Sequence, residues 1–334
     1  MVMTSTILAA EYGENQAMAG NLLPLSIARR DNRLMIARKY LYLIALAKER
    51  HFGRAATSCH VSTSTLSAAI RDLEAELGVA VVERGQHFTA LTPDGEQVLD
   101  YAQRIAALAQ ALKQELAKAR GGLSGQLRLG VIPTGLTAVA ELTSSLARRH
   151  PLVAILVKSL STQEIIDRLR RFELDAGIVY RESGTAADLS FQPLWEEGHV
   201  LITGSGGLFD GRDTASWQEA AQLPLCLLTP DMQNRKIINQ VFSDLGCAVT
   251  PRLEANSMLC ILAHVCTGAW SSVVPRAVLD LIGTPKGISV LDLTHPRVTW
   301  ATGLLTLAAE PPPPMVAVLR EEARSLRVLT GKDE

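Results

Sequence analysis

The sequence predicts an α/β protein in two parts, a small helical module followed by a larger domain in which strands and helices alternate. Three observations carry this prediction. Apolar residues recur at helical spacing between Ile36 and Leu77, and a longer helical pattern begins at Pro93. Beyond a glycine-rich stretch at 121–125, short apolar runs alternate with helix patterns. Such alternation is typical of a parallel sheet covered by helices.

Length and composition restrict the class of protein. A chain of 334 residues predicts about two domains. It holds no run of the ~18 apolar residues that a membrane-spanning helix needs, so no membrane partner is expected. The first apolar stretch, 7–10, is too short for an export signal, which predicts a cytoplasmic protein. The net charge of −1 argues against a protein that coats nucleic acid, but it leaves room for a local DNA-reading module.

The five cysteines are scattered, with no C-x-x-C pair and no cysteine–histidine cluster at zinc spacing. This pattern suits reduced thiols in the cytosol and predicts no metal site. A redox switch built on Cys260 and Cys266 is the alternative, although motif-free cysteines more often behave as small buried apolar residues. No cofactor-binding motif is present, so we expect no cofactor.

Helical elements open the core of the chain. Residues 1–34 show no sustained period, and we expect either a disordered extension or a true start at Met35. From Ile36 to Ala47 the apolar residues have the spacing of one helical face. A short second helix follows Phe52, and a third begins after Ser62, a good N-cap, and stops at Gly78.

The third helix has two different faces. Its apolar stripe consists of Leu66, Ile70, Leu73 and Leu77, and short polar side chains lie opposite. A recognition helix needs this combination, because it must anchor to its own module while presenting small groups to base edges. We expect phosphate or minor-groove contacts from Arg54, Arg71 and Arg84, for which a solvated face is the alternative reading. The expected base-facing row is Ser62, Thr63, Ser64, Thr65, Ser67 and Ala68.

Two short strands, 79–83 and 88–91, can pair around a basic tip, and we interpret them as a wing. Thr92, Pro93 and Asp94 then open a longer helix as N-cap, first-turn proline and dipole-favourable acid. Its apolar positions alternate steps of four and three, the seam of a helix that packs on another helix: Val98, Ala102, Ile105, Ala109, Leu112 and Leu116. Because no partner is adjacent in sequence, we favour dimerisation over packing on its own domain.

The glycine-rich stretch marks a hinge before the larger domain. Helices are expected up to Leu146, at 162–172 and at 315–329. Strands are expected at 127–132, 154–157, 176–179, 199–202, 225–228, 249–253, 271–274, 288–291 and 299–307.

Together these motifs resemble the LysR-type transcriptional regulators. The resemblance extends from Met35 to about Leu329, and the order and spacing of its motifs match without a gap. The motifs lie at 51–56, 61–62, 65–67, 70–74, 76–78, 83–84 and 91–95. It implies a winged helix-turn-helix, a dimerising linker helix and a two-lobed α/β effector domain like a periplasmic binding protein, usually in a tetramer. Thr63, Ser64 and Ala68 depart from the family's usual residues, so the operator sequence does not carry over.

The resemblance also implies how the chain is divided into domains. The expected parts are the extension (1–34), the DNA-binding domain (35–92), the linker helix (93–120), the hinge (121–125) and the effector domain (126–330). Lobe I would hold about 126–203 and 298–330, and lobe II about 204–297. The implied function is operator binding or promoter activation, modulated by a small anionic metabolite between the lobes. The implied partners are double-stranded DNA, that effector, further copies in a homodimer or homotetramer, and RNA polymerase as a candidate.

Polar side chains near strand ends are the candidates for the effector site. Thr134 follows the first strand, where a helix start can hold an anion or the threonine can simply cap the helix. Ser161 begins a capping box at the carboxyl end of a strand, where open α/β sheets bind ligands. Arg235 is a candidate bidentate partner for a carboxylate. The other candidates are Thr203, Gln233, Asn234, Asn256 and Ser257.

The run 224–235 is similar to a subgroup that accompanies NAD-dependent formate dehydrogenase genes. This similarity makes formate or another small carboxylate the expected effector.

Two other classes compete with a regulator. An enzyme is disfavoured and no catalytic residues are expected, because the chain has no G-x-S-x-G, Walker A, H-E-x-x-H or G-x-G-x-x-G motif. A stand-alone cytosolic small-molecule binding protein would suit the C-terminal two-thirds, but the helix-turn-helix counts against it. The sequence does not separate an activator from a repressor.

Overall fold

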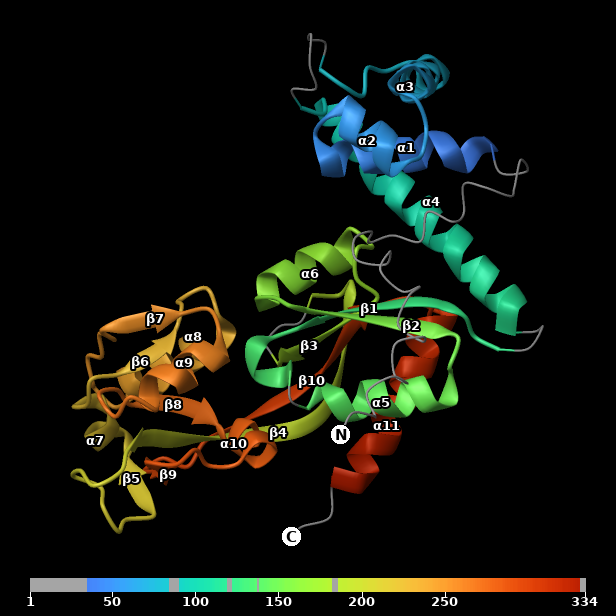
Figure 1. The fold of residues 1–334 in the computed structure, drawn as a ribbon. Helices are drawn as coiled ribbons and strands as arrows, with labels where there is room; N and C mark the ends of the chain where they lie inside the picture. Colours follow the sequence, from blue (N-terminus) through green and yellow to red (C-terminus); the bar gives the residue numbers. More distant parts are fainter. Residues whose placement is uncertain (1–34, 84–89, 119–121, 137, 182–185, 331–334) are drawn as a thin grey trace, which may run out of the picture. The chain divides into compact units, whose positions relative to one another are not determined.

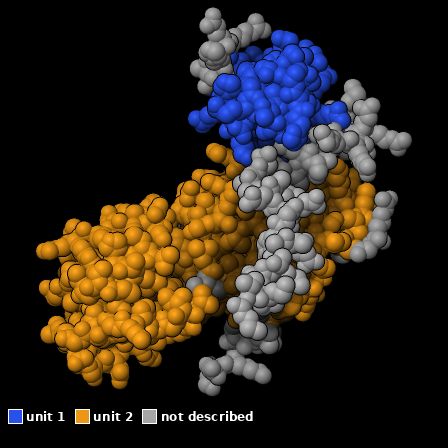
Figure 2. All heavy atoms as spheres, in the orientation of Figure 1, with its two compact units in different colours: residues 1–106 blue, residues 107–334 orange. Residues whose placement is uncertain are grey.

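The structure is a computed structural model that describes residues 35–83, 90–118, 122–136, 138–181 and 186–330. The predicted extension and the predicted wing tip with Arg84 lie outside the described residues. The chain divides into two compact units, residues 1–106 and 107–334 (Figure 2). This division falls within the predicted linker helix.

Three helices pack around one apolar core in the first unit: α1 (Met35–Glu49), α2 (Phe52–Ser58) and α3 (Thr63–Leu77). They confirm the predicted helices. Leu66, Ile70 and Leu73 on α3 are buried, as the apolar stripe requires. Leu77 is 41% exposed and departs from that prediction, because the helix ends there. An ion pair of 2.7 Å between Lys39 and Glu76 joins α1 to α3.

Both ends of α3 are fixed by local chemistry. Ser62 Oγ accepts a hydrogen bond from the Thr65 amide at 3.1 Å, which confirms the predicted N-cap. Gly78 ends the helix with φ of 73°, a conformation that favours glycine. Glu74 Oε1 then accepts hydrogen bonds from the amides of Val81 at 2.8 Å and Val82 at 3.1 Å. The segment after α3 is therefore tied to the helix.

The two sides of the predicted wing pair where the structure describes them. Val82 forms an antiparallel bridge with Leu91. Beside it the Glu83 amide donates to the carbonyl oxygen of Ala90 at 3.1 Å. The base of the hairpin is confirmed within the described residues.

The long helix α4 (Pro93–Lys118) begins as predicted, with Thr92 Oγ1 accepting from the Gly95 amide at 2.9 Å. The predicted seam divides into two parts. Val98 and Ala102 pack in the core of the first unit, because they lie next to α1–α3. Of the later seam positions, Ala109 is half-buried, and Ile105 (36%), Leu112 (61%) and Leu116 (51%) are exposed in the single chain. Two large side chains outside the predicted seam, Tyr101 (62%) and Leu108 (71%), are exposed as well.

The second unit has two lobes (Figure 1). Lobe I contains β1 (Gly125–Val131), η2 (Pro133–Leu136), α5 (Val139–Arg149), β2 (Val153–Ser159), α6 (Thr162–Arg170), β3 (Ala176–Tyr180) and α11 (Pro314–Thr330). Lobe II contains β5 (Thr214–Ser216), α7 (Trp217–Ala221), β6 (Cys226–Leu228), α8 (Gln233–Asp244), β7 (Leu253–Ala255), α9 (Met258–Val265), β8 (Ser272–Pro275), α10 (Arg276–Ile282) and β9 (Ile288–Thr294). The strand β4 (Leu189–Gly204) runs from one lobe into the other, paired with β10 (Thr299–Leu307).

The main sheet has the strand order β2-β1-β3-β10-β4-β9-β5, with β8 paired to β4, and β6 and β7 form a separate parallel pair. The expectation of a parallel sheet is correct for β1 with β2 and β3 but wrong for the centre. There β10 is antiparallel to both β3 and β4, and β4 is antiparallel to β8 and β9. The sheet is mixed because the chain passes out of lobe I along β4 and returns along β10.

Two strand predictions were also wrong in extent. Only 199–202 was expected of the 16-residue β4, because Pro193, Glu196 and Gly198 interrupt its apolar pattern. The strand expected at 249–253 is instead β7, which begins at Leu253. Pro251 lacks the amide hydrogen that a strand would use, which accounts for the later start.

Gly95 marks a close approach between α4 and the segment after α3. A Cβ at this position would overlap the carbonyl oxygen of Val81. Gly95→Ala must therefore push the helix away, and we expect local opening of the first unit to become easier by about 1–3 kcal/mol, as in overpacked cores. Amide hydrogen exchange of α1–α3 in the full chain measures this. Glu96→Ala, at the exposed neighbouring position, is the control; unchanged exchange in Gly95→Ala would contradict the close approach.

Candidate functional site

The first candidate site is the N-terminal end of α3. Ser62, Thr63, Ser64 and Thr65 are exposed, while Ser67 and Ala68 are half-buried. Ser62 Oγ lies 2.8 Å from both Ser64 Oγ and Thr65 Oγ1. These hydroxyls therefore surround the amide end of a 15-residue helix, where a phosphate is favourably bound.

The three predicted arginines differ in their surroundings. Arg54 is held by its own module, because its Nη2 donates to the carbonyl oxygen of Glu49 at 2.6 Å and its Nε lies 3.7 Å from the Glu49 carboxylate. Arg71 is exposed on α3, and no contact of its side chain is found among the described residues. Arg84 lies outside the described residues. Of the two that can be compared, Arg71 is the freer cation.

A second candidate site joins the lobes through buried polar side chains. The structure brings together two predicted effector residues, Thr134 of lobe I and Asn234 of lobe II, through the hydroxyl of Tyr180. Thr134 Oγ1 lies 3.0 Å from Tyr180 Oη, and Asn234 Nδ2 lies 3.2 Å from the same oxygen. Tyr180 also bonds Glu197 Oε1, and Asn234 Nδ2 lies 2.7 Å from His199 Nε2. We call these five side chains the interlobe network.

The donors and acceptors of the network can be assigned from the number of hydrogens available. Tyr180 has one hydroxyl hydrogen, which it donates to the Glu197 carboxylate, so its oxygen accepts from the Thr134 hydroxyl and from Asn234. The second N–H of the Asn234 amide points to His199, whose Nε2 must therefore accept. A neutral imidazole that accepts at Nε2 carries its hydrogen on Nδ1. Nδ1 has no partner among the described residues.

Burial controls the charges in the interlobe network. It raises the pKa of Glu197 to about 7 and lowers the pKa of His199 to about 3. Burial also raises the pKa of the Tyr180 hydroxyl well above its usual value, and the negative charge of Glu197 adds to this effect. Tyr180 and His199 are consequently neutral at physiological pH, while Glu197 is close to half-protonated.

The remaining predicted effector residues lie outside the network. Ser161 caps α6 in a capping box with Glu164. Thr203 Oγ1 lies 2.7 Å from Ser271 Oγ. Asn256 and Ser257 are exposed at the start of α9, where Ser257 is the N-cap. Gln233 opens α8 beside Asn234.

Arg235 does not have the geometry that a bidentate carboxylate partner needs. Its Nη1 donates to the carbonyl oxygen of Leu228 and to Glu254, both at 2.8 Å, and its Nε donates to Asn239 at 2.8 Å. The Arg235 side chain is only 6% exposed. It anchors α8 within lobe II.

The sequence did not single out Tyr180, Glu197 or His199. Tyr180 is the last residue of an apolar strand. The role of its hydroxyl becomes apparent only in the structure, where Asn234 donates a hydrogen bond to it. The spacing of Glu197 and His199 contains a usable signal, because residues two apart on a strand share one face. That signal is visible only once 189–198 is known to be strand.

In the part of the chain that the structure describes, no helix is long and apolar enough to cross a membrane. The same residues contain no group of three or more histidine, cysteine or acidic side chains arranged to hold a metal ion.

Comparisons with known proteins cover both units. Residues 37–96 match the model of the bacterial regulatory helix-turn-helix proteins of the lysR family, and residues 120–327 match the LysR substrate binding domain. A probable hydrogen peroxide-inducible genes activator of Mycobacterium avium is 29% identical over 78% of this chain and 85% of its own length. The DNA-binding transcriptional dual regulator OxyR of Escherichia coli is 27% identical over 81% of this chain and 88% of its own.

Solved structures agree with these matches. A variant of full-length OxyR from Pseudomonas aeruginosa has a TM-score of 0.70 and 30% identity, covering 86% of this chain and 94% of that one. Full-length CbnR in complex with its target DNA has a TM-score of 0.63 at 22% identity, covering 87% and 99%, and shows the likeness of fold. Because the two matched models together span the helix-turn-helix and the two-lobed domain, the chain belongs to the LysR family of DNA-binding transcriptional regulators with an effector-binding domain.

Proposed function

We propose that this regulator reads operator DNA in the cytoplasm through α3 and Arg71, pairs with a second copy through α4, and responds to a small metabolite bound between its lobes. The observation that carries the proposal is the two-faced α3, whose buried stripe anchors a row of exposed hydroxyls. Ser62, Thr63, Ser64 and Thr65 are short enough to approach base edges or phosphates from a helix in the major groove.

The dimer contact is supported by the uncovered part of α4. Four large side chains of this helix, Tyr101, Leu108, Leu112 and Leu116, are each more than half exposed in the single chain. A long helix with such an apolar stripe is stabilised when a partner helix covers it. A dimer would present two copies of α3 to the two halves of a palindromic operator, and pairing of dimers would give the expected homotetramer.

The effector proposal is supported by the interlobe network. Thr134 follows the carboxyl end of β1 and Tyr180 is the last residue of β3, at the edge where open α/β sheets bind ligands. A small anion that accepted hydrogen bonds from Thr134 and Asn234 would replace the Tyr180 oxygen and loosen a contact between the lobes. Formate and other small carboxylates are therefore the first ligands to test.

The names of the relatives raise peroxide as a different signal. A thiol reacts with peroxide as its thiolate, so a sensor cysteine needs a lowered pKa. Burial instead raises the pKa of Cys226 to about 11 and also raises the pKa of Cys59. All five cysteines are free. Cys59 and Cys226 therefore do not have the lowered pKa that a peroxide-sensing thiol needs.

DNA footprinting upstream of the protein's own gene tests the function, because a regulator protects a defined site and a stand-alone binding protein protects none. On that site Arg71→Ala should weaken binding and reduce the slope of log K against log salt by about 0.9, the value for one lost phosphate contact. Arg148→Ala removes the same charge from α5 and should leave the slope unchanged. A slope that Arg71→Ala does not alter would exclude the phosphate contact.

The network predicts an unusual dependence of stability on pH. The folded pKa of Glu197, about 7, lies above its ordinary value of 4.5. Between these values the folded chain keeps a proton that the unfolded chain has lost, so this group's contribution to stability falls as pH rises. For His199 the folded pKa of about 3 lies below the ordinary 6.5, and its contribution falls as pH drops below 6.5. From pH 4.5 to 6.5 the two effects oppose each other.

Glu197→Gln removes one of these effects. We expect the variant to gain about 3 kcal/mol relative to the native chain between pH 4.5 and pH 7, from a pKa shift of about 2.5 units at 1.36 kcal/mol each. The unfolding free energy of the second unit, followed by hydrogen exchange in the full chain, measures the gain. Glu196→Gln changes the exposed neighbour and serves as the control. If the unfolding free energies of Glu197→Gln and the native chain change in parallel with pH, the raised pKa of Glu197 is refuted.

A further inference from the structure

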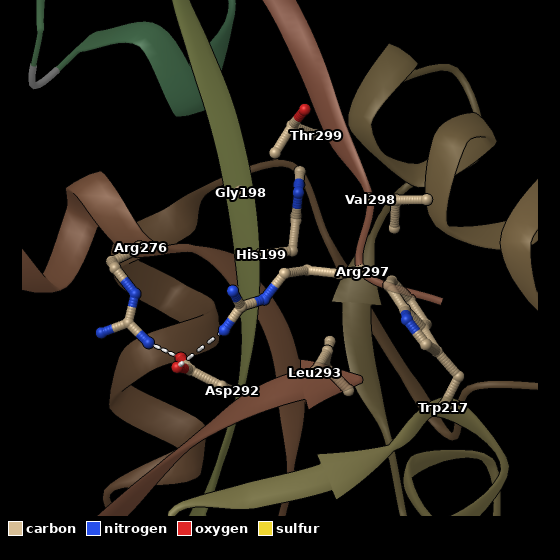
Figure 3. A pocket seen from close by; sticks show the side chains of 9 residues that line it. All are labelled: Gly198, His199, Trp217, Arg276, Asp292, Leu293, Arg297, Val298 and Thr299. Carbon is tan, nitrogen blue, oxygen red and sulfur yellow. Dashed lines mark ion pairs between the residues drawn. The ribbon is translucent and has the colours of Figure 1, made fainter. Parts of the chain in front are cut away.

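A pocket of about 160 Å³ opens in the second unit where β4, β9 and β10 meet (Figure 3). His199 lines it from β4, Trp217 from the start of α7, and Arg276 from the start of α10. Asp292 on β9, Arg297 in the connection to β10 and Thr299 at the start of β10 are further polar lining residues. A cavity of about 150 Å³ can hold a benzene molecule, so this pocket has room for a short-chain organic acid.

The charges in the pocket do not balance. Arg276 and Arg297 approach the Asp292 carboxylate from two sides in Figure 3. Arg276 forms an ion pair with Asp292, whereas Arg297 Nη2 lies 4.0 Å from Asp292 Oδ2 and its side chain is 81% exposed. Two guanidinium groups and one carboxylate leave a net charge of +1 in the pocket. Because Arg297 lies farther from Asp292 than Arg276 does, its N–H groups are the ones available to a ligand.

The pocket is a built feature of the fold. Trp217 Nε1 donates to the carbonyl oxygen of Pro296 at 3.0 Å, which holds the connection that carries Arg297 against α7. Asp292 pairs with Val200 on β4 and with Thr214 on β5, so its backbone is fixed on both sides. Trp217, Leu293 and Val298 supply an apolar wall beside the cations.

His199 adds an unpartnered donor to this lining. The residue is 93% buried, and its Nε2 accepts from Asn234 of the interlobe network. The hydrogen on Nδ1 is left without a partner among the described residues. A buried N–H without an acceptor costs free energy, which a ligand oxygen would recover.

From this geometry we propose that the pocket binds a short-chain carboxylate, distinct from any effector between the lobes. One carboxylate oxygen is received by the Arg297 guanidinium and the other faces the Nδ1–H of His199, while the alkyl chain lies along Val298. Because His199 also belongs to the interlobe network, a ligand at this site changes a residue that contributes to the contact between the lobes.

Isothermal titration calorimetry of the full chain with propionate tests the proposal. Propionamide, with the same shape and no charge, is the ligand control, and equal binding of the two would overturn recognition of an anion. Arg297→Gln should weaken propionate binding roughly tenfold or more, as expected for the loss of a hydrogen bond between charged partners. Arg252→Gln removes an exposed arginine elsewhere in lobe II and should leave the affinity unchanged.

The remaining outcomes are equally decisive. Absence of heat with propionate, or equal affinity in Arg297→Gln and the native chain, overturns the site. Loss of affinity confined to Arg297→Gln supports it. Because Arg297 lies outside the DNA-binding module, the footprint of this variant reports separately on the proposed function.

Discussion

The carboxamide of Asn234 carries two N–H bonds, and the contact between the lobes depends on where they go. One is donated to Tyr180 Oη of lobe I and the other to His199 Nε2 on the strand that links the lobes. Both donors are then occupied, so Tyr180 Oη and His199 Nε2 each act as an acceptor toward Asn234. The hydroxyl hydrogen of Tyr180 is then available for Glu197, and His199 must carry its hydrogen on Nδ1.

This constraint gives β4 its central place in the second unit. Glu197 and His199 lie two residues apart and share one face of the strand. Below Glu197's raised pKa the network can be entirely neutral, which is the state that a buried site favours. The same His199 ring closes the network on one side and lines the pocket of Arg297 on the other. A change in the contact between the lobes and a change in the pocket therefore both involve His199.

The sequence predicted those parts of the fold whose signals are local. The caps Ser62, Gly78 and Thr92 each act within one turn of helix, so they could be placed without the rest of the chain. The centre of the sheet could not, because β4 is interrupted by Pro193 and Gly198 and is stabilised by its pairing with β10, about a hundred residues away in sequence. The antiparallel pairing of two strands that lie far apart in sequence produces no periodic pattern of residues from which it could be predicted.

The candidate sites divide in the same way. The polar face of α3 follows from helical spacing and was predicted. Thr134 was a candidate from its place after a strand, and Asn234 from its place at the start of a helix. Arg235 was assigned to a ligand because arginine commonly receives carboxylates, but Glu254 and the carbonyl oxygen of Leu228, which occupy it, become neighbours only through the pairing of β6 with β7. The roles of Tyr180 and His199 can be recognised only from the contact between the two lobes.

Nitrogen-15 NMR of the imidazole rings tests the central constraint most directly. The resonances of His199 can be assigned by their loss in His199→Gln. The account predicts a neutral ring with its hydrogen on Nδ1, unchanged from pH 7 to pH 5, because Asn234 donates to Nε2 and burial opposes protonation. A ring with its hydrogen on Nε2, or one that becomes protonated near pH 6.5, would contradict the account.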